Sequence, residues 1–387
     1  MFGPHLNKAF RSRPTPFYYY DLDVLRDTLT RLSRAAKRHG YQVHYAVKAN
    51  AEPRILQIIR EYGLGADCVS GNEVARALEV GFPREKVVFA GVGKTDAEIR
   101  LALERDIAVF NCESLQELTV INEIAGALGK RARVAFRLNP DVDARTHAYI
   151  RTGLAHDKFG IHAPEWPEVL ALLPKLRHVE PVGLHFHIGS QITDLEVFRE
   201  LALQVNRIQE KVRATGWHPR HLNLGGGLGI DYRNPNALPD FEAYFDVFQT
   251  YLRPLPEQTI HFELGRAVVA PCGTLVSRVT YVKRATQVTF AVLDASMTDL
   301  LRPALYGAEH KIENLSRNGP VQTYDVVGPV CESADRFGRN VRLPETRRGD
   351  LVAIRSAGAY GQVMASRYNL RDLAPAVFSD ELAEASQ

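Results

Sequence analysis

Reactive side chains close two of the short apolar runs in this sequence. Lys48 closes the run that begins at Val43. An amine that is partly desolvated there has a lowered pKa and can attack an aldehyde, although a surface lysine at a strand end is the plainer alternative. His185 and His187 end a later run and point the same way, because residues two apart in a strand share a face. No third ligand follows at a suitable spacing, so we expect no metal and favour His187 as a plate against a planar cofactor.

Two further runs end in groups that suit a phosphate and a ring nitrogen. Residues 225–229 read GGGLG, and a loop without side chains leaves its backbone N–H groups open to an anion. Residues 263–266 read ELGR, and Glu263 could hydrogen-bond the nitrogen of a pyridine-type cofactor. That carboxylate would keep the ring protonated, so that the ring can accept electrons from a breaking bond. An internal ion pair between Glu263 and Arg266 is the alternative.

These residues come together if the runs before them are the parallel strands of one barrel. Short β-branched runs alternate with amphipathic stretches such as 52–63 and 114–129, each of which ends in the glycine of a helix C-cap. This rhythm predicts an α/β fold with a (β/α)8 TIM barrel, whose reactive groups lie where the strands end. The eight runs are VHYAVKA from Val43, ADCVS from Ala66, VVFAG from Val87, IAVFNC from Ile107, VAFRLN from Val134, VGLHFHIG from Val182, LNLGGG from Leu222 and IHFELG from Ile260.

The rhythm changes after Arg266, where turns rather than long helices separate the apolar runs. Segments such as TLVSRVTYVKRA and DLVAIRSAGAY are typical of strands, so the C-terminal part is predicted to be a mostly β domain. The string FYYYD from Phe17 is also strand-like, and Asp21 can cap the helix that follows. We therefore predict a barrel over residues 25–266 and a β-rich domain made of residues 1–24 and 267–387.

Composition narrows the class of protein. The 387 residues are 45% hydrophobic and 24% charged, with a net charge of +3 and no dense Lys/Arg run, so we expect a small-molecule partner and no nucleic acid. The four cysteines are widely spaced and lack zinc-site spacing, which favours reduced thiols. Neither a signal peptide nor a membrane span is indicated, and we expect a cytoplasmic protein without membrane partners.

Taken in order, these strand ends resemble those of the fold-type III pyridoxal 5′-phosphate (PLP) enzymes, which include the diaminopimelate, ornithine and arginine decarboxylases. The resemblance covers nearly the whole chain. ELGR departs from the Glu-Pro-Gly-Arg of many members at Leu264, a change that we take as conformational. Strings similar to diaminopimelate decarboxylases are NPDVDARTHAYIRTG from Asn139, KFG from Lys158, HFHIGSQ from His185, RPALY from Arg302, HKIENL from His310, CESAD from Cys331 and SAGAYG from Ser356.

The resemblance implies the roles of the residues around the cofactor. Lys48 forms the Schiff base with PLP, Glu263 binds the ring nitrogen and His187 stacks on the ring. The residues implied for the phosphate are Ser190, Gly227, Gly265, Arg266 and Tyr360.

The resemblance also implies a homodimer with two shared active sites. The segment around Cys331 and Glu332 would reach the neighbouring barrel, where Cys331 would return a proton to the substrate, a role that a thiol can fill because it titrates not far above neutral pH. A small buried apolar residue is the commoner fate of a free cysteine. The residues expected to bind the distal carboxylate and ammonium of the substrate are Arg266, Arg302, Tyr306, Glu332 and Tyr360.

The implied activity is that of a carboxy-lyase, which converts meso-2,6-diaminopimelate to L-lysine and CO2 in the last step of lysine biosynthesis. A decarboxylase of ornithine, lysine or arginine is the nearest alternative, and it would have little use for Arg302 and Glu332. A non-catalytic PLP-binding regulatory protein is an alternative of another class, although Lys48, Glu263 and Cys331 are all present. Alanine racemase also joins a PLP barrel to a β domain, but CESAD and the carboxylate-binding set argue against it.

Overall fold

The chain folds into two compact units in the computed structural model, which describes residues 2–144 and 158–384. Leu29–Gly229 and Pro239–Gly265 form the barrel unit, and Met1–Thr28, Ile230–Leu238 and Arg266–Gln387 form the β-rich unit. The segment Ile230–Leu238 leaves the barrel unit and returns to it, an excursion that the ranges drawn from the sequence did not include.

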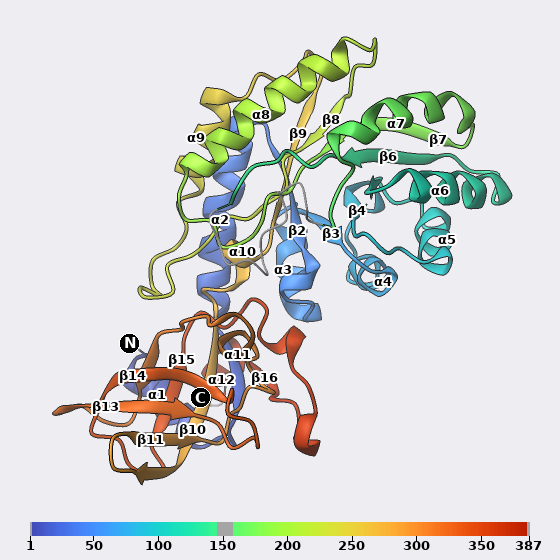
Figure 1. Cartoon of the computed structure of the whole chain (residues 1–387). Coiled ribbons are helices and arrows are strands. Elements are labelled where there is room, and N and C mark those ends of the chain that lie inside the picture. The colour runs from blue at the N-terminus through green and yellow to red at the C-terminus, as the bar shows by residue number, and fades with distance from the viewer. Residues whose placement is uncertain (1, 145–157, 385–387) are drawn as a thin grey trace. The chain divides into compact units, whose positions relative to one another are not determined.

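Eight parallel strands close the barrel in sequential order, from β2 round to β9, which pairs with β2 (Figure 1). Each of the eight predicted runs contains residues of one of these strands, so the predicted barrel is confirmed. The strands are β2 Gln42–Ala46, β3 Gly65–Cys68, β4 Val87–Phe89, β5 Val109–Cys112, β6 Ala132–Arg137, β7 Val179–His185, β8 His221–Asn223 and β9 Thr259–Leu264.

Helices connect the strands, and several of them are capped by the polar residue that precedes them. Ser70, Ser114 and Asp240 accept hydrogen bonds from the first turn of their helices, and Thr95 forms a capping box with Glu98. The helical stretches predicted at 52–63 and 114–129 are α3 and α6. The helices are α2 Leu22–His39, which spans both units, α3 Pro53–Glu61, α4 Gly71–Glu79, α5 Asp96–Glu104, α6 Leu115–Ala127, α7 Trp166–Leu172, α8 Glu196–Arg213 and α9 Phe241–Tyr251.

The β-rich unit is built on one sheet with the path β12-β15-β10-β11-β13-β14. The strand predicted at FYYYD is β1, Phe17–Tyr20, which pairs antiparallel with β10 and parallel with β16. Its four side chains are buried, and Asp21 accepts the first N–H groups of α2 as expected. The other strands are β10 Gly273–Arg284, β11 Thr289–Leu293, β12 Ile312–Asn314, β13 Val321–Val327, β14 Arg336–Pro344, β15 Leu351–Ile354 and β16 Ala376–Phe378.

Short helices complete the β-rich unit, namely α1 Pro4–Arg11, α10 Arg266–Val269, α11 Arg302–Tyr306 and α12 Ser379–Glu384. A core of apolar side chains from Phe10, Phe17, Tyr19 and Val276 joins α1 to this sheet. The segments that sequence predicted as strands after Arg266 are therefore present, and the fold class of a barrel with a mostly β domain is confirmed.

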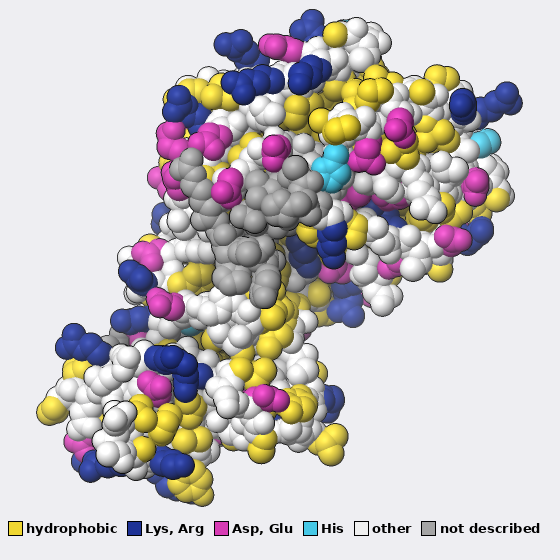
Figure 2. Space-filling view, viewed as in Figure 1, with side chains coloured by type: hydrophobic (Ala, Val, Ile, Leu, Met, Phe, Trp, Pro, Cys, Tyr) yellow, Lys and Arg dark blue, Asp and Glu magenta, His cyan; other side chains and the backbone are white. Residues whose placement is uncertain are grey.

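The surface carries both signs of charge. Figure 2 shows Lys and Arg interspersed with Asp and Glu over the face in view. Within the described parts of the chain, every helix is too short or too polar to span a bilayer.

Candidate active site

Lys48 lies just beyond the end of β2, in the 3-10 turn Val47–Ala49, rather than in the strand itself. Its Nζ is 3.4 Å from Oδ2 of Asp67 on the neighbouring strand β3, and Asp67 is fully buried. Burial and the nearby Glu263 carboxylate raise the pKa of Asp67 to about 8, although Lys48 opposes the shift. The lysine side chain remains 38% exposed, so its amine is both oriented and accessible.

Glu263 lies inside the barrel and accepts hydrogen bonds from three other strands. Asn111 Nδ2 on β5 and Asn223 Nδ2 on β8 donate to Oε1 over 3.1 and 2.7 Å. His185 Nε2 on β7 lies 3.0 Å from Oε2. Because β5 and β9 are not neighbours in the barrel, the bond from Asn111 crosses its interior. The carboxylate is therefore fixed in orientation by groups that the hydrophobic pattern alone does not mark.

The carboxylate of Glu263 stays ionised. Burial opposes ionisation, but the charge and hydrogen bond of His185, with further help from the charge of Lys48, outweigh it and lower the pKa of Glu263 below its ordinary value. Lys48 and His187 both lie within electrostatic reach of Glu263. An ionised carboxylate in this place can hold a proton on a ring nitrogen.

His187 is a neutral ring. Gly226 N–H donates to its Nδ1 over 3.2 Å, which leaves any proton of a neutral ring on Nε2. Burial, followed by the nearby Arg137 and Lys48, lowers the pKa of His187 well below its ordinary value. A neutral imidazole suits the predicted role of an aromatic plate, and it would not repel a protonated ring.

Three more histidines fill the barrel interior on the N-terminal side of Glu263. His44 Nε2 lies 3.0 Å from His261 Nδ1, and the rings of His221 and His261 are 3.8 Å apart. Burial is the main cause of a lowered pKa at each of them, to about 3 at His221. Neutral imidazoles can pack in this way without the repulsion that imidazolium ions would suffer.

The glycine loop after β8 has two separate reasons to lack side chains. A Cβ at Gly226 would lie 1.7 Å from the carbonyl oxygen of Glu263, because the loop packs directly against β9. Gly227 has a φ of +103°, and a Cβ there would lie 2.6 Å from Gly189 O, next to Ser190 in the chain. Two residues predicted to bind the phosphate, Ser190 and Gly227, thus lie in adjacent loops.

Gly265 packs against the turn that carries Lys48. A Cβ at Gly265 would lie 3.0 Å from the Cβ of Ala49 and 3.1 Å from that of Ala46. Its backbone therefore follows the end of β2 closely, in keeping with its predicted place near the cofactor.

The β-rich unit contains a cluster of two buried arginines. Arg266 Nη1 donates to Tyr232 Oη over 2.8 Å, and its Cζ lies 4.8 Å from the centre of the Tyr360 ring. Arg302 Cζ lies 4.8 Å from the centre of the Tyr232 ring, and its Nη1 donates to His310 Nε2 over 2.8 Å. Tyr232, which the sequence reasoning missed, thus connects two of the predicted substrate residues, and a third, Tyr360, contacts Arg266.

Cys331 and Glu332 lie on the surface of the β-rich unit and are exposed. Cys331 N–H donates to Asn369 Oδ1 over 3.3 Å, and Glu332 Oε1 accepts from Tyr368 over 3.1 Å. The other three cysteines are buried and free. Tyr306, the last residue of α11, is half-buried.

The site residues fall into two groups along the chain. Lys48, His187, Ser190, Gly227, Glu263 and Gly265 belong to the barrel unit, and Arg266, Arg302, Tyr306, Cys331, Glu332 and Tyr360 belong to the β-rich unit. Sequence reasoning did not assign the partners Asp67, Asn111, Asn223, Tyr232 and His310. Their polar character inside strand-like runs, at Asp67, Asn111 and Asn223, was a usable signal.

The motifs that begin at Asn139 and at Lys158 lie partly among the described residues. In the motif from Asn139, residues 145–153 lie outside the described residues. Near the KFG motif, Arg137 pairs with Glu113 over 2.8 Å, and Gly160 N–H donates to the same carboxylate over 3.1 Å. This buried ion pair ties the end of β6 to the residues that follow β5.

The barrel residues fit pyridoxal phosphate. An accessible amine at Lys48, a neutral ring at His187 and an ionised carboxylate at Glu263 match the aldehyde, the ring face and the ring nitrogen of this cofactor. Among residues 2–144 and 158–384, no group of three or more His, Cys, Asp and Glu side chains could hold a metal ion.

Comparison with known proteins agrees with this chemistry. Residues 25–270 match the family described as pyridoxal-dependent decarboxylase, pyridoxal binding domain. A Bacteroides thetaiotaomicron protein named diaminopimelate decarboxylase is 56% identical over 376 residues, 96% of this chain and 97% of the relative. A Helicobacter pylori protein of the same name is 42% identical over 368 residues, 94% of this chain and 90% of the relative.

A solved structure extends the likeness to three dimensions. A crystal structure of a variant of diaminopimelate decarboxylase from Helicobacter pylori, complexed with L-lysine, matches with a TM-score of 0.91 and 40% identity. The match covers 97% of this chain and 94% of that chain. Because such matches extend over nearly its whole length, the chain belongs to the diaminopimelate decarboxylase family of pyridoxal-dependent decarboxylases.

Proposed function

We propose that this protein decarboxylates meso-2,6-diaminopimelate to L-lysine and CO2. The observation that carries the proposal is the buried Glu263 carboxylate, which His185 holds in its ionised form within reach of Lys48 and His187. The names of the relatives at 56% and 42% identity support the choice of substrate.

The barrel residues act on the cofactor. Bound pyridoxal phosphate supplies an aldehyde for an amine and a ring that accepts the electrons of the bond to CO2. Lys48 would hold the cofactor through its amine. Glu263 keeps a proton on the ring nitrogen, and His187 covers one face of the ring and excludes water from it. Ser190, Gly227, Gly265, Arg266 and Tyr360 hold the phosphate.

The residues of the β-rich unit act on the substrate. Arg302, with Arg266, Tyr306 and Tyr360, binds the distal carboxylate, because a guanidinium can form two parallel hydrogen bonds to a carboxylate. Glu332 pairs with the distal ammonium. A substrate that lacks the second carboxylate leaves a buried guanidinium without a counter-ion, and we expect the enzyme to reject it.

A homodimer with shared active sites completes the proposal. Cys331 returns a proton to the α-carbon after CO2 has left, and it acts in the site of the neighbouring subunit. The exposure of Cys331 and Glu332 on their own unit supports this arrangement. We propose a cytoplasmic location for the enzyme, in the last step of lysine biosynthesis.

The decisive experiment incubates the purified protein, loaded with pyridoxal phosphate, with meso-diaminopimelate, ornithine, arginine or lysine. We expect equal amounts of CO2 and L-lysine from diaminopimelate and little CO2 from the other three. Release of CO2 mainly from ornithine, arginine or lysine would refute the substrate. Cofactor binding without any CO2 would instead indicate a non-catalytic PLP-binding protein.

The place of the cofactor has its own test. Borohydride reduction of the loaded protein should attach the cofactor covalently to the peptide that contains Lys48. Lys48→Ala should abolish this attachment, whereas Lys37→Ala, at an exposed lysine on α2, should leave it unchanged. Covalent trapping in Lys48→Ala would refute the role of this lysine.

A further inference from the structure

Arg302 is a buried cation that is held, within the described residues, by neutral groups. It is 3% exposed, its Nη1 donates to His310 over 2.8 Å and its Cζ faces the ring of Tyr232. Within the described parts of the chain, no Asp or Glu forms an ion pair with Arg302, and its buried Nε has no hydrogen-bond partner. A buried guanidinium without a counter-ion is costly, so this arrangement indicates a place for an anion from a ligand.

Other arginines of the β-rich unit pair with carboxylates, which is the usual arrangement of a buried or partly buried arginine. Arg355 pairs with Glu313 over 2.9 Å, and Arg317 pairs with Asp350 over 2.8 Å. Both of these ion pairs lie within the β-rich unit, where they fasten segments to one another. Arg302 is more buried than either of them, yet its polar partner is an imidazole.

The contacts of His310 fix its protonation from both sides. Its Nδ1 lies 2.8 Å from the carbonyl oxygen of Arg355, which can only accept, so Nδ1 carries the hydrogen. The guanidinium of Arg302 can only donate, so Nε2 must present its lone pair. Burial and then the charge of Arg302 lower the pKa of His310 to about 3, which keeps this ring neutral.

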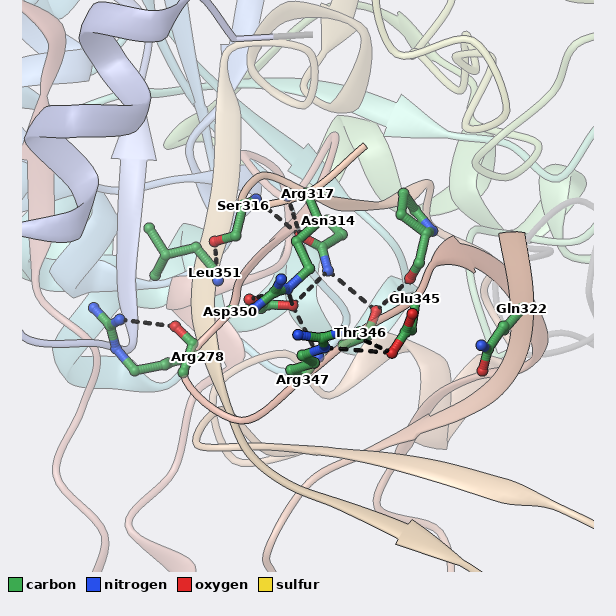
Figure 3. Close-up of polar contacts among 12 residues, drawn as sticks. Arg278, Asn314, Ser316, Arg317, Gln322, Glu345, Thr346, Arg347, Asp350 and Leu351 are labelled. Carbon is green, nitrogen blue, oxygen red and sulfur yellow. Dashed lines mark hydrogen bonds and ion pairs between the residues drawn. The ribbon is translucent and has the colours of Figure 1, made fainter. Parts of the chain in front are cut away.

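The segment after His310 is firmly anchored, which gives the HKIENL motif a physical role. Asn314, the last residue of β12, donates to Thr346 Oγ1 over 3.1 Å and to Asp350 Oδ2 over 3.2 Å. Asp350 also accepts from Arg317 Nε and from the backbone, as Figure 3 shows. His310 therefore precedes an anchored strand and also bonds the Arg355 carbonyl, so it has support that does not depend on Arg302.

Tyr232 holds the opposite side of the arginine cluster. Its hydroxyl accepts from Arg266, its ring face meets Arg302 and its ring lies edge-on to His310 at 4.8 Å between centroids. The segment that carries Tyr232 is in turn held by the bond from Arg355 Nη2 to Asn236 Oδ1, 3.1 Å long. Both supports of Arg302 thus rest on anchored backbone.

We propose that His310 and Tyr232 are positioning residues that fix Arg302 without neutralising its charge, so that Arg302 selects ligands by their carboxylate. The identity of that ligand, an α-amino acid with a free amine at its far end, rests on the proposed function. A carboxylate in the place of His310 would hold the guanidinium as well, but it would compete with the ligand for the positive charge. A neutral acceptor orients Arg302 and leaves its charge to the ligand.

Two substitutions of equal length separate charge from position. His310→Gln keeps a neutral acceptor for Arg302, and His310→Glu places an anion there. The experiment measures, by calorimetric titration of the enzyme loaded with pyridoxal phosphate, the affinity for L-lysine and for 1,5-diaminopentane, which is lysine without its carboxylate. The thermal midpoint of each variant reports on folding.

We expect His310→Gln to bind L-lysine within a few-fold of the unmodified enzyme. We expect His310→Glu to bind it about tenfold to a hundredfold more weakly, because a charge-assisted hydrogen bond to the ligand is lost. Binding of 1,5-diaminopentane should change little in either variant. The thermal midpoint of His310→Glu should not fall below that of His310→Gln, since the new ion pair holds Arg302.

Substitutions of Tyr232 test the proposal independently of His310. Tyr232→Phe keeps the ring face beside Arg302 and should keep the preference for lysine over 1,5-diaminopentane, whereas Tyr232→Leu should lose most of it. Equal lysine affinity in His310→Glu and His310→Gln would overturn the proposal, as would an equal loss for both ligands. These binding results do not depend on turnover, so failure to decarboxylate diaminopimelate would count against the proposed function alone.

Discussion

His185 Nε2 lies 3.0 Å from Glu263 Oε2 in the interior of the barrel, although the two residues are 78 positions apart in the chain. This contact contributes most to keeping the Glu263 carboxylate ionised against the effect of its burial. Lys48 on the turn after β2 and the ring of His187 lie within electrostatic reach of the same carboxylate, and the loop after β8 packs against the backbone of Glu263. We therefore propose that the chemistry of the barrel depends most directly on the charge of Glu263.

Removal of His185 should shift the acid limb of the pH profile of kcat to higher pH. In the proposed function Glu263 acts as a carboxylate, so we expect activity above its pKa and a loss of activity as the pH falls through it. His185→Leu removes the main group that lowers this pKa, and we expect the loss of kcat to begin at a higher pH than in the unmodified enzyme. The check is kcat for diaminopimelate between pH 5 and 9.

The control for this prediction is His178→Leu, which changes a histidine outside this contact. If kcat of His185→Leu, measured with the cofactor fully bound, falls at the same acidic pH as kcat of the unmodified enzyme, the role given to the contact of His185 with Glu263 is contradicted.

Loss of the charge itself should reduce catalysis more than cofactor binding. Glu263→Gln keeps the size and much of the hydrogen bonding of the side chain but cannot stabilise a protonated ring nitrogen. We expect kcat to fall by about a hundredfold or more, while borohydride still traps the cofactor at Lys48. Glu180→Gln, at a carboxylate on β7 that pairs with Arg220, is the matched control. Full activity in Glu263→Gln would exclude the proposed role.

Much of this architecture follows from the sequence because the strand pattern is local. The runs that contain Lys48, His185 and Glu263 each predict a buried strand with a polar end. A barrel brings such ends together, whatever the distance between them in the chain. The comparisons confirm the family that these strand ends resemble.

The sequence does not reveal contacts that depend on how segments of the β-rich unit pack. Tyr232 reaches Arg266 and Arg302 because Ile230–Leu238 leaves the barrel, and no periodicity marks that excursion. The pairing of His310 with Arg302 depends likewise on the anchoring of β12, a strand of only three residues. The string HKIENL alone therefore gives no physical reason for its presence.

Asp67 should make the stability of the protein depend on pH. Its pKa is about 8 in the folded protein and about 3.9 in an unfolded chain, so the folded state binds one proton more between these values. The stability that this proton provides is fully present below about pH 4 and is lost as the pH rises through 8. Asp67→Asn should remove this dependence.

We expect the thermal midpoint of cofactor-free Asp67→Asn, relative to the unmodified protein, to rise by about 2 °C or more between pH 5 and pH 8. Asp23→Asn, whose side chain is 94% exposed, should show no such change. If the thermal midpoints of Asp67→Asn and of the unmodified protein change with pH in parallel, the carboxyl of Asp67 is already ionised at pH 5.

The proposed sharing of active sites predicts that two inactive variants can restore activity together. Lys48→Ala removes the amine proposed to hold the cofactor, and Cys331→Ala removes the proposed proton donor, so each homodimer should lack activity at both of its sites. If Cys331 acts in the neighbouring subunit, a mixed dimer has one site with both lesions and one intact site. Random mixing makes half of the dimers mixed, so co-expression should restore about a quarter of the unmodified activity.

The check is kcat for diaminopimelate in co-expressed protein, at the same total concentration of chain as each variant alone. If both residues belong to one subunit's site, the mixed dimer has no intact site and the activity stays at the level of the single variants. Co-expression of Cys331→Ala with Cys272→Ser, at a buried thiol of the same unit, is the matched control. It should return half of the activity of Cys272→Ser, because every subunit that carries Cys331 then serves a site with an intact Lys48.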